Sequence, residues 1–497
     1  MKFKAFFLWI AFFSFLVINA QDQRVRTIVT TDGEIDDVDT FIRMLLYANE
    51  FKLEGLIYSS SMWHYRGDGT GTEFTSKMKM TKEMYGPKTD LRWPGTQWIQ
   101  DLVQAYAKVY FNLIQHSVNY PSPEYLMSLI RVGNVNFEGE MEQRTAGSEF
   151  IAAKLVQNDT SDLFLQAWGG TNTIARALKS IEEDFKGTDE WNRIYQLVSN
   201  KAIIYTIMDQ DDTYQNYISK VWPDIRVYYN AAQFAAFAYP WKRIVPKTSQ
   251  KYLEGTFMGP EIINNHGPLL KKYYSYGDGQ QQEGDDEHIH GDLSKIKDTQ
   301  WGSFERYDFI SEGDTPAYLH LVDIGLQNYS NPTYGGWGGR FLPSKKNPNV
   351  YKDGDLVTDL NPETKKQDLY YPQTRWIEAI QNDFAARADW CITTFEEANH
   401  PPRIDVEQPK FLKIKAGAHL KLRFNSADLD GDQITHKVWN YTELSTVKVK
   451  VEHNQQEAFI EVDQHAKKGD VIHLVVEGTD NGYPALTRYQ RVVLQVN

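Results

Sequence analysis

The chain has 497 residues and a formal net charge of −13 at pH 7. This length exceeds the usual size of one domain, so we expect two or more domains. The acidic balance argues against nucleic acid or an anionic membrane as a partner, because both carry negative charge themselves.

The first twenty residues have the pattern of a signal peptide. Lys2 and Lys4 precede an apolar stretch at 5–18, and Ala20 ends a sequence that resembles a signal-peptidase site. The apolar stretch is short for a membrane span. We therefore expect residues 1–20 to be removed, leaving a secreted or periplasmic chain without a membrane span; an uncleaved anchor is the alternative. Removal takes away two lysines and no acid, so the net charge changes from −13 to −15.

Short apolar runs alternate with longer amphipathic stretches from about residue 24 to residue 326. The runs predict strands at 27–29, 53–58, 163–167, 202–207 and 225–229, and the amphipathic stretches predict helices at 98–116, 147–157 and 173–185. This alternation is typical of an α/β fold, a mostly parallel sheet with helices on both faces. Gly, Pro, Asn and Tyr then predict long ordered loops at 328–371, before a helix at 374–389.

The pattern changes at the proline pair Pro401 and Pro402. Strands without good helices follow at 411–414, 419–424, 447–451, 458–462, 471–477 and 488–496. About seven short strands in about a hundred residues are typical of an all-β sandwich. We therefore expect a first domain at 21–399 and a β-sandwich accessory domain at 400–497.

The single cysteine, Cys391, excludes a disulfide within the chain. An exported protein without disulfides must gain its stability from a large core or from bound metal. We expect Cys391 to be a buried structural residue.

Five acidic residues directly follow the first predicted strand: Asp32, Glu34, Asp36, Asp37 and Asp39. A strand, a glycine turn and a helix place them at the carboxyl end of a strand, where ligands bind in open α/β sheets. Carboxylates this close repel one another unless a cation lies among them, and such hard oxygen ligands suit Ca²⁺ or Mg²⁺. The cluster predicts a metal site; a solvated helix N-terminus, which also favours acidic residues, is the alternative.

Two later segments could converge on these carboxylates. The sequence Gly-Gly-Thr-Asn at 169–172 again leads from a predicted strand into a helix, and its glycines allow a close backbone approach. The sequence Glu-Gly-Asp-Thr-Pro at 312–316 precedes a helix that opens at Pro316, although helix capping alone would explain its aspartate.

A shorter acidic turn, Asp-Leu-Asp-Gly-Asp at 428–432, lies in the predicted sandwich. Its spacing resembles part of a calcium loop, but the later Glu of an EF-hand loop is missing. A hairpin turn of Asp and Gly is the favoured interpretation.

Together these segments resemble the nucleoside hydrolase fold, through Asp32-x3-Asp36-Asp37, Thr171-Asn172 and Asp314-x-Pro316. The sequences Gln-Asp-Asp at 210–212, Asn-His-Gly-Pro at 265–268 and Gly-Gly-Trp-Gly-Gly-Arg at 335–340 are similar to the nucleoside hydrolase-like branch found in secreted bacterial proteins. Some members of that branch carry the label cellulose-binding protein and a C-terminal sandwich similar to cadherin or immunoglobulin modules.

The resemblance implies a role for several residues. Asp32, Asp37 and Asp314 would bind Ca²⁺ through their side chains, and Thr171 through its backbone carbonyl. Asp32 would also be the base that activates the attacking water, and Asp36 would hydrogen-bond a sugar hydroxyl. Further substrate contacts are expected from Asn172, Asp212, Trp63, Trp337 and Arg340, since exposed rings could stack on a sugar, although core packing of the rings is the alternative.

The chain departs from nucleoside hydrolases at three positions. Thr30 replaces the first Asp of their opening pair, Gly33 replaces the usual Pro after the second Asp, and Gly313 replaces the His that precedes the late Asp and protonates the leaving base. His266, Glu312 or Asp212 could supply an acid instead, although the favoured interpretation of each is structural: a loop contact, backbone amides or a turn cap. We expect the unused Glu34 and Asp39 to face solvent or cap the helix.

Three functions therefore compete. The first is a secreted Ca²⁺-dependent hydrolase of a glycosidic bond, with a carbohydrate or a nucleoside-like small molecule as partner. The second is a non-catalytic carbohydrate-binding protein, and the third is a nucleoside hydrolase. The residues do not predict an oligomeric state.

Overall fold

A computed structural model describes residues 24–284, 290–354 and 356–497, so the expected signal peptide lies outside the described residues. Its largest sheet has eight strands in the order β5-β2-β1-β6-β7-β8-β10-β9. Neighbouring strands pair in parallel except β9, which is antiparallel to β10. The bounds are β1 (Arg26–Thr31), β2 (Lys52–Tyr58), β5 (Ile130–Val132), β6 (Leu163–Ala167), β7 (Ala202–Ile207), β8 (Arg226–Asn230), β9 (Leu342–Pro343) and β10 (Val350–Lys352).

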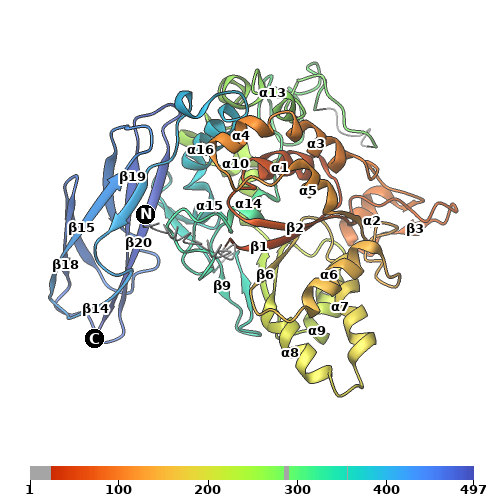
Figure 1. Cartoon of the computed structure of the whole chain (residues 1–497), viewed down its shortest axis with the longest axis horizontal. Coiled ribbons are helices and arrows are strands. Elements are labelled where there is room, and N and C mark those ends of the chain that lie inside the picture. Colours follow the sequence, from red (N-terminus) through yellow and green to blue (C-terminus); the bar gives the residue numbers. More distant parts are fainter. Residues whose placement is uncertain (1–23, 285–289, 355) are drawn as a thin grey trace, which may run out of the picture.

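Helices cover both faces of this sheet (Figure 1). One core cluster packs Phe41 and Leu45 beneath helices of one face, and a second packs Ile174 and Leu178 beneath helices of the other. Central strands such as β6 and β7 are buried along their whole length, as expected for parallel strands covered on both sides. The principal helices are α1 (Ile35–Leu46), α3 (Trp98–Ala107), α4 (Tyr110–His116), α5 (Pro123–Ser128) and α16 (Ile377–Asp389), and on the other face α6 (Ala146–Val156), α7 (Asn172–Phe185) and α8 (Trp191–Lys201).

The predicted helix at 98–116 is interrupted. The backbone N–H of Lys108 bonds to the carbonyl of Ala105, and that of Val109 bonds to Tyr106. These bonds span three residues instead of four, so the chain tightens and α3 ends before α4 begins.

The C-terminal part is a sandwich of two four-stranded sheets, ordered β13-β15-β18-β17 and β14-β20-β19-β16. A separate apolar core lies between them, with Leu422 and Leu474 among its members. The predicted α/β fold with an all-β C-terminal sandwich is confirmed, although the sequence patterns missed β13 and β16. The bounds are β13 (Arg403–Val406), β14 (Phe411–Ile414), β15 (His419–Ala427), β16 (Thr435–Asn440), β17 (Val449–His453), β18 (Glu457–Val462), β19 (Val471–Thr479) and β20 (Thr487–Val496).

The sandwich packs closely on the first part of the chain, beside α16 (Figure 1). Trp337 and Tyr489 belong to the same core cluster as the residues of α1 and α16, so that core continues across the junction. Arg491 of β20 is fully buried and donates to the carbonyls of Leu326 and Tyr334 at 2.9 and 2.8 Å. The proposed domain boundary between residues 399 and 400 stays a prediction.

None of the described helices is both long enough and apolar enough to cross a bilayer.

Candidate metal centre

The acidic cluster lies at the carboxyl end of β1, where the chain turns into α1. Because β1 lies between β2 and β6, this end is the point where later strands are added on the opposite side of the sheet, a place where ligands bind in such folds. Asp32 and Asp37 are almost completely buried, with 2 and 1% of their surface exposed. Asp36 and Glu34 keep partial exposure.

A distant segment brings one more carboxylate to this place. Asp314 is the N-cap residue of the short helix α14 (Thr315–Leu319), but its side chain makes no capping hydrogen bond. Its oxygen lies with those of Asp36 and Asp37 in a group whose members are within 4.8 Å of one another. Thr31 donates a hydrogen bond to Asp37. Within the described residues, Oδ2 of Asp32 and Oδ1 of Asp314 have no hydrogen-bond partner although both atoms are buried. Unpartnered buried acceptors of this kind suit a cation.

The electrostatics of the cluster also favour a bound cation. Burial, followed by repulsion from neighbouring carboxylates, raises the pKa of Asp36, Asp37 and Asp314 well above the usual range. A hard cation among these oxygens would offset both effects. The donor set therefore fits Ca²⁺.

Asp32 differs from the other three aspartates in its electrostatic surroundings. Burial opposes its ionisation, but the neighbouring His64, and to a smaller extent Ser61, outweigh burial and lower the pKa of Asp32. Nδ1 of His64 lies 3.8 Å from Oδ2 of Asp32, and both side chains are buried. Asp32 is therefore held in the ionised form that a base requires.

His64 was not among the residues singled out from the sequence. It lies in the loop after β2. Because β2 is the parallel neighbour of β1, the loops that follow these two strands lie side by side at their carboxyl ends. Only the strand order places the two residues together. A lone histidine between two aromatic residues offered no signal of this contact.

Two glycines allow the segments to approach this closely. A Cβ at Gly169 would lie 2.7 Å from Cγ of Asp32, and a Cβ at Gly313 would lie 2.9 Å from Oδ2 of Asp36. A side chain at either position would collide with an aspartate. The glycine that replaces a histidine before Asp314 thus leaves room for Asp36.

Thr171 and Asn172 lie where β6 leads into α7. The Thr171 carbonyl accepts one hydrogen bond, from the N–H of Ala175 at 2.8 Å, and so retains a lone pair for an ion. The Asn172 side chain donates to Ser60 Oγ and to the Asn134 carbonyl, both at 2.9 Å, and is fully buried. Asn172 therefore holds loops together in this structure.

Glu312 is fully buried in an ion pair with Arg43 of α1. The Arg43 Nε lies 2.7 Å from Glu312 Oε2, and Tyr273 and Thr315 also donate to this carboxylate. Burial raises the pKa of Glu312, while the Arg43 charge opposes that shift. The carboxylate accepts hydrogen bonds from every one of these partners.

The other two predicted acids have partners of their own. Nε2 of His266 lies 3.1 Å from Oδ1 of Asp389, at the end of α16. The Asp212 carboxylate accepts a hydrogen bond from Gln215, and its backbone has a positive φ of 61°. Neither of these contacts involves the aspartates at β1.

The predicted aromatic and arginine contacts are divided between two places. Trp63 lies in the loop that carries His64 and is partly exposed. Trp337 is completely buried in the core that reaches the sandwich. Arg340 pairs with Asp359 at 2.6 Å, close to the same junction. The glycine-rich loop at 334–340 therefore supports the sandwich in this structure.

The two leftover acids differ in their outcome. Glu34 is the N-cap residue of α1, and the hydroxyl of Tyr239 donates to it at 2.9 Å. The expectation that Asp39 faces solvent or caps the helix is wrong: it is fully buried and accepts from the N–H of Tyr274 at 2.8 Å. Asp39 lies in the second turn of α1 and contacts the loop that follows α13 (Gly267–Leu270).

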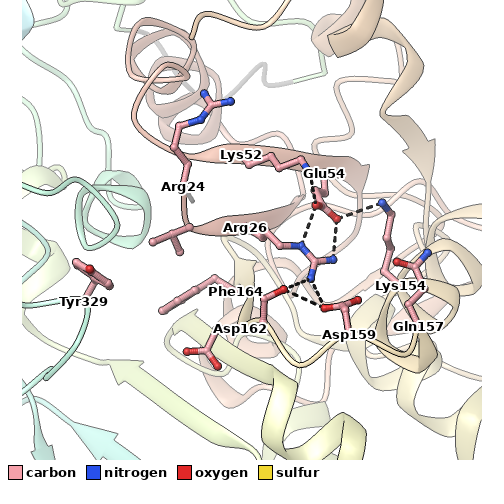
Figure 2. A pocket seen from close by; sticks show the side chains of 12 residues that line it. Arg24, Arg26, Lys52, Glu54, Lys154, Gln157, Asp159, Asp162, Phe164 and Tyr329 are labelled. Carbon is pink, nitrogen blue, oxygen red and sulfur yellow. Dashed lines mark hydrogen bonds and ion pairs between the residues drawn. The ribbon is translucent and has the colours of Figure 1, made fainter. Parts of the chain in front are cut away.

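A pocket of about 520 Å³ lies at the opposite, amino-terminal end of the strands, near the first residues of β1, β2 and β6 (Figure 2). Arg26 pairs there with Glu54 and Asp159 at 2.8 and 2.6 Å, and Lys154 also pairs with Glu54. These charges neutralise one another, and the pocket is at the amino ends of the strands. We therefore place the functional site at the aspartates, at the carboxyl ends.

A match to a known protein family shows to which family this chain belongs. The family described as "Cellulose-binding Sde182, nucleoside hydrolase-like domain" matches residues 26–341, well over half of the chain. The chain belongs to this family. The family's C-terminal domain, described as "Cellulose-binding protein Sde0182, C-terminal domain", matches residues 419–496. The resemblance seen in the sequence is thereby confirmed.

One solved structure agrees with this family at the level of the fold. A nucleoside hydrolase-related hypothetical protein from Saccharophagus degradans, described as associated with carbohydrate metabolism, has 25% identity and a TM-score of 0.69, covering 95% of this chain and 100% of its own. The plant nucleoside hydrolase PpNRh1 has 10% identity and a TM-score of 0.31, covering 69% of this chain and 91% of its own. No curated protein matches the sequence.

Proposed function

We propose that this family member is a secreted Ca²⁺-dependent hydrolase that cleaves a glycosidic bond of a carbohydrate. The observation that carries the proposal is the convergence of Asp36, Asp37 and Asp314 at the carboxyl end of β1, with Asp32 near enough to raise the pKa of Asp37 and Asp314. Among the described residues, buried oxygens of Asp32 and Asp314 also lack hydrogen-bond partners. The cellulose-binding description of the family supports a carbohydrate as the ligand.

The ion would be held by Asp37 and Asp314, together with Asp32 or Asp36 and the Thr171 carbonyl. When bound, Ca²⁺ would orient a sugar diol and make a nearby water more acidic. All four side-chain donors are hard oxygens, which favours Ca²⁺ over softer metals.

The protein's own groups would perform the remaining chemistry. Asp32, kept ionised beside His64, would take the proton from the attacking water. Asp36 keeps partial exposure and would accept a hydrogen bond from a sugar hydroxyl. The negative charge of the cluster would stabilise the oxocarbenium-like transition state of glycoside cleavage.

A second candidate is a non-catalytic carbohydrate-binding protein. The contacts of the predicted acids favour it, because Glu312 accepts hydrogen bonds from Arg43, Tyr273 and Thr315, and His266 is paired with Asp389. A general acid must hold a proton that it can donate to the leaving group. Both oxygens of Glu312 already accept hydrogen bonds from protein groups, so its geometry directs no proton toward a substrate.

A parallel assay of turnover and binding would separate these functions. The purified chain would be incubated with cello-oligosaccharides, other glycans, inosine and uridine, in Ca²⁺ or in a chelator, with Asp32→Ala as the inactive control. New reducing ends that require Ca²⁺ and Asp32 support the hydrolase. Calorimetric binding of a glycan without any turnover supports the second candidate, and release of free base supports a nucleoside hydrolase.

A further inference from the structure

A second group of acidic side chains lies in the sandwich, at the turn between β15 and β16. Oxygens of Asp428, Asp430 and Asp432 are all within 4.8 Å of one another. Because Ca²⁺ binds oxygen at about 2.3–2.6 Å, two ligands on opposite sides of one ion are about 4.6–5.2 Å apart. One calcium ion could therefore contact all three carboxylates.

Two buried side chains from other segments add to this group. Asp480 follows β19 and is 4% exposed, and Asn399 precedes the sandwich and is 7% exposed. In the described part of the chain, Oδ2 of Asp480, Oδ1 of Asn399 and Oδ2 of Asp428 are buried acceptors without a hydrogen-bond donor. Burying an unpaired acceptor is unfavourable, so three of them together call for a ligand.

The orientation of Asn399 follows from its contacts. Its Nδ2 donates to the carbonyl of Pro484 at 2.7 Å and to Oδ1 of Asp480 at 3.2 Å. Both hydrogens of the amide are therefore used. Its oxygen remains as an acceptor beside the Asp480 carboxylate.

Further contacts hold the three segments together. The N–H of Gln433 donates to Oδ1 of Asn481 at 2.7 Å, which joins the turn after β15 to the loop after β19. His400, next to Asn399, contacts both oxygens of Asp430, at 2.6 Å from its N–H and 2.9 Å from its ring Nδ1.

A simple hairpin turn explains only part of this arrangement. Oδ1 of Asp428 accepts from the N–H groups of Asp430 and Asp432 at 2.9 and 3.1 Å, as a turn of Asp and Gly requires. The turn does not account for the unpartnered oxygens of Asp428, Asp480 and Asn399. It also does not account for the buried Asp480, which contacts Asn399 next to His400.

We propose that Asp428, Asp430, Asp432, Asp480 and Asn399 form a Ca²⁺ site that is separate from the aspartates at β1. Five protein oxygens, completed by water, satisfy the six to eight ligands that Ca²⁺ takes, and irregular loops suit its flexible geometry better than the strict octahedron of Mg²⁺. The ion joins the segment that enters the sandwich to two loops of the sandwich, and so stabilises this end of the domain.

The test is calorimetric titration of CaCl₂ into the full chain carrying Asp37→Ala, which disables the aspartates at β1. We expect one Ca²⁺ per chain in this background. Adding Asp432→Ala should weaken Ca²⁺ binding at least tenfold without unfolding the sandwich, because the Asp432 carboxylate belongs to the acidic group and is only partly buried. Asp405→Ala, which removes an exposed carboxylate of β13, is the matched control and should leave binding unchanged.

Two results would overturn the proposal. One is a lack of Ca²⁺ binding in the Asp37→Ala chain whose circular dichroism spectrum is that of the wild type. The other is Ca²⁺ binding that survives Asp432→Ala, and likewise Asp480→Asn, with unchanged affinity. Titration with MgCl₂ tests the identity of the ion, and Mg²⁺ affinity equal to that for Ca²⁺ would contradict the assignment.

Discussion

Nε of Arg43 lies 2.7 Å from Oε2 of Glu312, and neither side chain has any exposed surface. The pair joins α1, which carries Asp36 and Asp37, to the segment that carries Asp314. Two opposite charges buried together are stable only while both are present, since the loss of one leaves the other without compensation. The ion pair therefore fixes the distance between the two halves of the aspartate cluster.

Glu312→Gln should destabilise the protein by about 3–5 kcal/mol, because it leaves Arg43 buried without a counter-charge. Chemical denaturation monitored by circular dichroism would measure this loss. Glu124→Gln, at an exposed position of α5, is the control and should change stability by less than about 0.5 kcal/mol. Loss of turnover at unchanged stability would instead make Glu312 the general acid.

His64→Ala should shift the acidic limb of the pH–activity profile to higher pH. His64 lowers the pKa of Asp32, so its removal raises that pKa and the base becomes protonated at a higher pH. Initial rates between about pH 4 and pH 8 would show the shift, and His419→Ala, an exposed histidine of β15, serves as control. An acidic limb that does not move would argue against this role of His64.

Asp37→Asn should stabilise the chain in a chelator and abolish its gain in stability from Ca²⁺ at the β1 site. Burial raises the pKa of Asp37 above 3.8, so the metal-free folded chain retains a proton that the unfolded chain releases. Its stability therefore falls as pH rises above about 3.8 toward the raised pKa. Asn cannot ionise, and its oxygen still accepts from Thr31.

Melting temperatures of wild type and Asp37→Asn at about pH 5 and pH 8, with chelator or Ca²⁺, would test this sign. The advantage of the variant in chelator should grow with pH. A variant that melts below the wild type in chelator at the higher pH contradicts the prediction.

Arg491→Met should weaken the packing of the sandwich on the first domain. It removes donors to the buried carbonyls of Leu326 and Tyr334, each worth about 1–3 kcal/mol when left unpaired. We expect the wild type to unfold in one calorimetric transition, because a single core crosses the junction, and the variant to unfold in two. Arg403→Met, at an exposed ion pair, should keep one transition.

Much of the fold was predictable because strands and helices have different periods. Apolar runs located β6 and β7 at their observed bounds, and amphipathic stretches located α6 and α7 to within a residue. The break between α3 and α4 was missed because hydrophobic periodicity continues across a tightened turn. Strand β16 was missed because four of its six residues are polar, and one of its buried residues is His436.

The candidate site was predictable only in part. Asp32, Asp36 and Asp37 lie close together in the sequence, between the end of β1 and the first turn of α1, so their proximity follows from local structure. The roles expected of Trp337 and Arg340 depended on exposure, and in the structure both contribute to the junction with the sandwich. Exposure is a property of the packed molecule, which the order of residues in a loop does not reveal.

The sequence by itself determined that acidic residues end the first strand of a parallel sheet, because apolar periodicity and chain order are local properties. Only the tertiary structure decided that Asp314 joins them, that His64 lies beside Asp32, and that Glu312 is bound to Arg43. Each of these pairings joins segments that are distant in the chain. Their contacts depend on strand order and side-chain packing, which are set by the whole core together.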